Sequence, residues 1–88
     1  MNSDNTSETT IDFPAECTFK AVFRNREETE TSIRHLLGEK NLKGSITGKK
    51  SKNGKFISYT VIARYDTEDQ LQEICRQVSA LQGYMTLF

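Results

Sequence analysis

The chain lacks tryptophan and is poor in several residues that functional sites and membrane segments require. Its 88 residues include one histidine, one proline and two cysteines. No run of residues approaches the roughly 20 apolar positions that a membrane-spanning helix needs. The N-terminus has neither the basic start nor the apolar stretch of a secretory signal peptide. We therefore expect a cytoplasmic protein with no membrane partner.

The formal net charge is zero, because 12 basic side chains balance 12 acidic ones. The chain as a whole therefore has no strong attraction to nucleic acid or to a membrane surface. Hydrophobic residues make up 35% of the 88 residues. A chain of this size and composition forms one domain and can close one core without a metal or disulfides.

The rare reactive residues do not form a catalytic or metal-binding pattern. Cys17 and Cys75 are far apart and in no redox or metal-ligand spacing, so we predict free thiols in the core of a protein from a reducing compartment. A Cys17–Cys75 disulfide is the alternative. His35 is predicted to lie on a helix surface beside Glu39, four residues further on. The sequence therefore predicts no enzyme, no cofactor and no metal site.

Alternation of apolar and polar residues predicts four strands. Residues 1–12 are polar and are predicted to form a disordered tail, so that one domain covers 13–88. The longest alternating patterns lie near the start of the domain and directly after the only Asn-Gly pair. The predicted strands cover 17–24, 42–50, 56–65 and 84–88.

Apolar residues at helical spacing predict two helices between these strands. The first is predicted to begin at an Asn25 N-cap, with a glutamate three residues later completing a capping box, and to stop at Gly38. The second has a more sustained apolar stripe. It is predicted to run from a cap at Asp66 or Thr67 to about Gln82.

The predicted order β-α-β-β-α-β is that of the ferredoxin-like fold of the α+β class, also called the alpha-beta plait. Right-handed crossovers place both helices on one face of a four-stranded antiparallel sheet. The predicted strand order in this sheet is 4-1-3-2, which puts the second and fourth strands at its edges.

Positive charge is concentrated in one stretch of the chain. From Lys40 to Tyr65 there are seven basic residues and no acidic one. These basic side chains either keep a solvated hairpin from pairing with other chains, or they form a contact surface for an anion. For the second interpretation we predict as binding residues the basic hairpin, which consists of Lys49, Lys50, Lys52, Asn53, Gly54 and Lys55.

Nucleic-acid binding by this fold normally adds aromatic rings on the uncovered face of the sheet. Phe56 and Phe19 are the candidates for such rings, and no RNP-like motif is present. The leading prediction therefore contains no nucleic acid. A nucleic-acid or anion-binding module that uses the basic hairpin region 43–55 is the alternative.

The last predicted strand, Tyr84–Phe88, is apolar and falls at an edge of the sheet. An uncovered apolar edge favours pairing with a second chain, and a single-layer sheet also leaves one face open. A homodimer through Tyr84–Phe88, or a complex with another protein, is therefore a further expectation.

Three segments together match the pattern of a known family. Phe13-Pro14 followed by 18–22 looks like its opening strand, 51–60 looks like its central hairpin, and the C-terminal strand also fits. On these segments the chain resembles the YbeD-like family, the bacterial domain of unknown function 493, over 13–88. The resemblance implies a fold related to the regulatory ACT domains and a bacterial cytoplasmic protein. It implies no catalytic residues, and it favours a regulatory or adaptor module that binds a small ligand or a protein partner.

Overall fold

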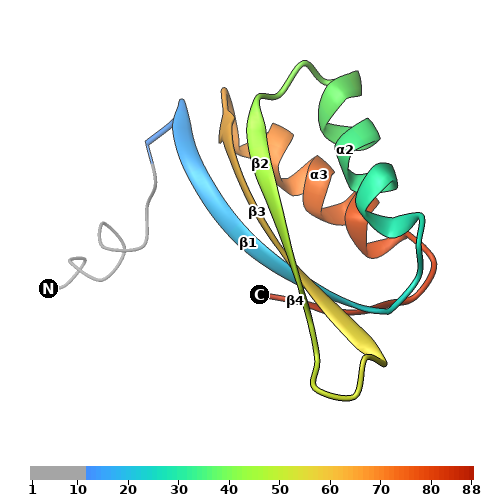
Figure 1. Cartoon of the computed structure of the whole chain (residues 1–88). Coiled ribbons are helices and arrows are strands. Elements are labelled where there is room, and N and C mark those ends of the chain that lie inside the picture. The colour runs from blue at the N-terminus through green and yellow to red at the C-terminus, as the bar shows by residue number, and fades with distance from the viewer. Residues whose placement is uncertain (1–11) are drawn as a thin grey trace, which may run out of the picture.

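The computed structural model describes residues 12–88, so the predicted tail lies outside the described residues except for Asp12. In Figure 1 the sheet forms one layer and the two helices lie side by side on one of its faces. The elements in chain order are β1 (Ala15–Arg24), α2 (Thr29–Glu39), β2 (Gly44–Lys50), β3 (Phe56–Tyr65), α3 (Glu68–Ser79) and β4 (Tyr84–Leu87).

The sheet has the strand order β2-β3-β1-β4, which is the predicted order 4-1-3-2 counted from the other edge. All three neighbouring pairs are antiparallel. The ferredoxin-like fold is therefore confirmed. β1 begins two residues earlier than predicted, because it pairs with β3 without interruption from Ala15 opposite Tyr65 to Arg24 opposite Phe56.

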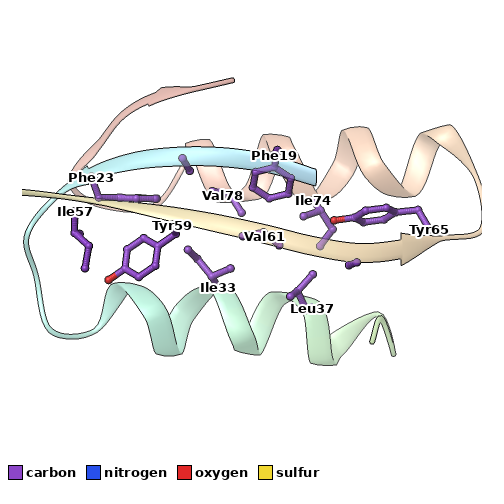
Figure 2. Packing of buried hydrophobic residues seen from close by; sticks show 12 residues of the cluster. Phe19, Phe23, Ile33, Leu37, Ile57, Tyr59, Val61, Tyr65, Ile74 and Val78 are labelled. Atoms are coloured by element: carbon purple, nitrogen blue, oxygen red, sulfur yellow. The ribbon is translucent and has the colours of Figure 1, made fainter. Parts of the chain in front are cut away.

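The core lies between the helices and one face of the sheet (Figure 2). Alternate residues of β1 and β3 face the helices, as the period of two requires. Phe19 falls in this set and is only 5% exposed, so the prediction that it could serve on the uncovered face is wrong. The buried apolar side chains are Phe19, Ala21, Phe23, Ile33, Leu37, Ile57, Tyr59, Val61, Ala63, Tyr65, Ile74 and Val78.

The start of α2 differs from the prediction. The helix begins at Thr29, and its N-cap position is Glu28, which makes no side-chain capping bond. Asn25, the predicted cap, is engaged elsewhere, because its side-chain amide donates to the Gly54 carbonyl and its backbone N–H to the Lys55 carbonyl, both at 2.9 Å. A long-range contact with the hairpin has therefore displaced a local capping interaction.

The end of α2 is set by an asparagine and not by the predicted glycine. The helix continues through Gly38 to Glu39, and the chain turns at Asn41, whose φ is +56°. The N–H of Asn41 donates to the Gly38 carbonyl and that of Leu42 to the Leu37 carbonyl, both at 3.0 Å. These two bonds form a Schellman motif. They occupy residues 41–42, and β2 consequently starts at Gly44 instead of Leu42.

The predicted cap of α3 is confirmed, because the Thr67 hydroxyl accepts from the backbone N–H of Gln70 at 3.2 Å. The helix ends at Ser79, earlier than the predicted Gln82. The chain then turns through Gly83, with φ +85°, into β4. Beyond β4, Phe88 still exchanges two backbone hydrogen bonds with Lys20, at 2.6 and 2.8 Å, so the pairing extends to the predicted end.

Candidate binding surface

The turn of the basic hairpin is held by side-chain hydrogen bonds within 51–56. The Asn53 side-chain oxygen accepts from the Ser51 hydroxyl at 2.8 Å and from the Lys55 backbone N–H at 2.9 Å. The Ser51 hydroxyl accepts from the Phe56 N–H at 3.2 Å. Gly54 has φ +74°, a conformation that side chains with a Cβ rarely adopt. Asn53 and Gly54 therefore determine the shape of the turn.

Asn25 fixes the hairpin to the end of β1. Its side-chain amide donates to the Gly54 carbonyl at 2.9 Å, beside the backbone bond to Lys55 described above. The two partners lie 29 and 30 residues further along the chain. No periodic or short-range pattern in the sequence connects such positions, and the role of Asn25 was missed for that reason.

The four lysines of the basic hairpin are all exposed, and they do not form one flat patch. Lys49 pairs with Ser58 and so points to the uncovered face of the sheet, whereas Lys50 pairs with Ile57 on the helix side. Lys52 and Lys55 flank the turn. In Figure 1 the turn between β2 and β3 projects beyond the ends of the helices, which makes the lysines accessible from both sides.

The face of the sheet opposite the helices, here called the open face, is mixed in character. Partners in an antiparallel ladder share a face, so the strand registers determine its membership. It contains four basic side chains, one carboxylate, several small hydroxyl residues and four apolar side chains. Its members are Glu16, Thr18, Lys20, Val22, Arg24, Ser45, Thr47, Lys49, Phe56, Ser58, Thr60, Ile62, Arg64, Thr86 and Phe88.

The helical layer carries charge of the opposite kind. Of the ten acidic residues that the structure describes, eight lie in the helices or the segments that lead into them. The ion pairs found within 12–88 are all in this layer too: Arg26–Glu28, Arg34–Glu30, His35–Glu39 and Arg76–Glu73. The basic side chains of the open face and the hairpin therefore have no carboxylate within 4.0 Å among the described residues.

The histidine and the two cysteines occupy positions typical of structural residues. His35 Nε2 lies 3.1 Å from Glu39 Oε2, and its side chain is 72% exposed, which confirms the predicted surface pair. Cys17 and Cys75 are free and pack against the core, also as predicted. Burial raises the pKa of the Cys75 thiol, and the nearby Cys17 adds to the shift. A thiol with a raised pKa is a poor nucleophile.

Within residues 12–88, no three His, Cys, Asp or Glu side chains come together in a way that would hold a metal ion. Over the same residues, the helices are too short and too polar for any of them to cross a membrane. What the described chain does bring together is charge: the cations of the open face and the hairpin are unpaired, and most of the carboxylates lie in the helical layer.

The element order, the sheet order and the placement of both helices on one face define a ferredoxin-like α+β domain. The chain belongs to the family described as protein of unknown function (DUF493), whose model matches residues 8–87. The resemblance seen in the sequence is thereby confirmed. A search of curated proteins gave no match.

Solved structures show the same fold. Protein HP0495 of Helicobacter pylori aligns with a TM-score of 0.81 and 24% identity over 100% of this chain and 94% of that chain. The ACT domain from GTP pyrophosphokinase of Chlorobium tepidum aligns with a TM-score of 0.64 and 16% identity, over 83% and 94%. The C-terminal domain of the MgtC protein from Mycobacterium tuberculosis gives 0.63 and 12%, over 90% and 89%. The chain is therefore ACT-like in fold.

Proposed function

We propose that this chain is a cytoplasmic regulatory or adaptor module without catalytic activity, which binds an anionic ligand or protein partner through the basic hairpin. The observation that carries the proposal is the separation of charge. The cations of Lys49, Lys50, Lys52 and Lys55 have no carboxylate within 4.0 Å among the described residues, while acids and ion pairs gather in the helical layer. Unpaired charge of one sign raises the local concentration of an oppositely charged partner.

Further observations support the proposal. The ACT-like fold is that of a class of regulatory modules, and the described residues offer no nucleophile beside a base. Hydrogen bonds also hold the turn in one shape, because the Asn53 side chain accepts within it and the Asn25 side chain binds it to the end of β1. A rigid surface loses less conformational entropy when a partner binds. The two free thiols agree with a reducing compartment.

The test is an amide NMR titration with pooled phosphorylated metabolites and with polyglutamate as a polyanionic probe. We expect shifts over Gly48–Lys55 in the wild type. They should be absent when the four hairpin lysines are replaced by Gln. A control removes the same number of positive charges from Arg26, Arg34, Lys40 and Arg76 and should leave the shifts in place. Equal responses of both variants would refute the hairpin as the binding site.

A nucleic acid bound by the region 43–55 is the second candidate. The observation in its favour is that Phe56 lies on the open face and that Phe88, 71% exposed, lies there as well. Binding of this kind weakens steeply as salt rises, because each phosphate contact releases counterions. A fluorescent 12-mer of polyuridine that binds with such a salt slope would favour this candidate, and absence of binding at low salt would remove it.

A homodimer through the Tyr84–Phe88 edge belongs to the same proposal. Among the described residues, Met85 and Phe88 are the large hydrophobic side chains that stand exposed, at 46% and 71%. Among residues 12–88, β4 pairs with β1 alone, so its outer edge has no partner strand in the described part of the chain. Sedimentation equilibrium should then give a dimer that Met85→Lys dissociates. A monomer at millimolar concentration would refute this part of the proposal.

A further inference from the structure

A hollow of about 240 Å³ lies on the open face, where the sheet meets the hairpin. Across the sheet, Lys49, Ser58 and Val22 form one row, and Phe56 stands in the next. The small Ser58 side chain between longer neighbours leaves the depression. Its lining consists of Val22, Lys49, Lys50, Ser51, Phe56 and Ser58.

The hollow combines an apolar floor with a cationic rim. Val22 and Phe56 supply the apolar atoms and are half-buried. The guanidinium carbon of Arg24 lies 5.9 Å from the centre of the Phe56 ring. Lys49, which pairs with Ser58, stands on the other side of β3. Such a site accepts one apolar side chain while the cations around it attract neighbouring carboxylates.

The charges of the whole open face agree with an acidic partner. The open face carries one carboxylate, that of Glu16, which pairs in register with Arg64. Its four cations are those of Lys20, Arg24, Lys49 and Arg64. None of the four cations has a carboxylate within 4.0 Å among the described residues. Complementary charge across an interface speeds association and fixes orientation.

The aromatic rings of the open face are placed badly for a nucleic acid. Phe56 is opposite Arg24 on β1, whereas Phe88 is opposite Lys20, two strands from β3 and four residues along. Standard strand dimensions put the two positions roughly 16 Å apart. Successive stacked bases lie much closer together, and the Phe56 ring already carries the Arg24 guanidinium. Val22, which lies on β1 between the two rings, offers no stacking surface.

We propose that the open face binds an acidic segment of a protein partner, with one apolar side chain of that segment seated in the hollow. This inference rests on the proposed function and deepens it, because it names the partner's chemistry and extends the site from the hairpin onto the sheet. Hairpin lysines then steer the segment electrostatically, and the hollow selects for the apolar anchor.

The experiment pans a random dodecapeptide display library against the full-length protein and measures selected peptides by fluorescence anisotropy and amide NMR. We expect enriched peptides to combine Asp or Glu with an aliphatic or aromatic residue, and to shift the amides of Val22, Lys49 and Ser58. Ser58→Leu fills the hollow and should weaken binding by about tenfold or more. Thr31→Leu adds the same side chain on the exposed surface of α2 and should leave the affinity within about twofold.

A second matched pair tests the charge. Arg24→Gln with Lys49→Gln should weaken peptide binding by about tenfold, whereas Arg34→Gln with Arg76→Gln, in the helical layer, should not. Enriched peptides without acids, or a Ser58→Leu variant that binds like the wild type, would overturn the inference. So would a polyuridine 12-mer that occupies the open face more tightly than the peptides. Shifts confined to Lys52–Lys55 would reject the open face and keep the hairpin proposal, while no shift with any probe would reject both.

Discussion

The two faces of the sheet are built from the same strands, but their residues differ in polarity and burial. On β1 the helix-facing residues Phe19, Ala21 and Phe23 are apolar and buried, while the alternate residues Thr18, Lys20 and Arg24 are exposed and polar. Burial decides the first set, because each buried apolar side chain contributes about 1.5–3 kcal/mol to folding. Nothing in the fold requires the second set to be basic. A single strand thus carries one set of residues for folding and another that is available for binding.

Truncating one aromatic residue on each face tests whether the two faces contribute differently to stability. Phe23 is fully buried and makes edge-to-face contacts with Tyr59 and Tyr84, with ring centres 6.0 and 5.8 Å apart. Phe23→Ala should lower the free energy of unfolding by about 3–5 kcal/mol. Phe88→Ala on the open face should change that of the monomer by less than about 0.5 kcal/mol. Urea unfolding followed by circular dichroism measures both. Similar losses for the two variants would contradict the division of roles.

Two glycines allow a second comparison, between an edge strand and a helix. A Cβ at Gly44 would collide with the Ile62 carbonyl and with Ala63 on β3, while a Cβ at Gly38 meets nothing within 4 Å. Gly44→Ala should therefore destabilise the protein by about 1–3 kcal/mol. Gly38→Ala should stabilise it by about 0.5–1 kcal/mol, since alanine favours the helix. Thermal unfolding would show shifts of opposite sign, and shifts of the same sign would contradict the strand register.

A smaller effect is expected from the buried phenol of Tyr65. Burial raises its pKa to about 12, and Cys75 and Cys17 add to the shift. Because an unfolded tyrosine titrates near 10, the neutral ring stabilises the fold below pH 10, and this contribution is lost as the pH rises from about 10 through 12. Stability curves measured across that range should fall for the wild type and remain flatter for Tyr65→Phe.

The same variant also tests the hydroxyl at neutral pH. The Tyr65 hydroxyl has no hydrogen-bond partner among the described residues, so its removal leaves no polar group behind. Tyr65→Phe should leave the free energy of unfolding unchanged or raise it by up to about 1 kcal/mol. A loss larger than about 1 kcal/mol would mean that the hydroxyl makes a bond in solution.

The sequence was sufficient for the helix-facing residues, because burial imposes a period that can be recognised. β3 lies at the predicted residues 56–65, and the Thr67 cap of α3 is a local pattern of four residues. The errors fall where a long-range contact decides. Asn25 caps no helix because it is hydrogen-bonded to Gly54 and Lys55. The end of α2 is set by Asn41, whose positive φ cannot be predicted from the spacing of apolar residues. The hollow on the open face was missed for the same reason, since the strand register creates it.

The smallest expected effect on stability is also the most informative about function. Arg24→Gln with Lys49→Gln removes two open-face cations that have no carboxylate within 4.0 Å among the described residues, and should change the free energy of unfolding by less than about 0.5 kcal/mol. Arg34→Gln breaks the 2.8 Å pair with Glu30, yet that exposed pair contributes only about 0.3–0.5 kcal/mol. Urea unfolding in low and high salt would compare the variants. If the open-face variant proves as stable as the wild type and yet loses its acidic peptides, the charge on that face serves binding, because folding does not depend on it.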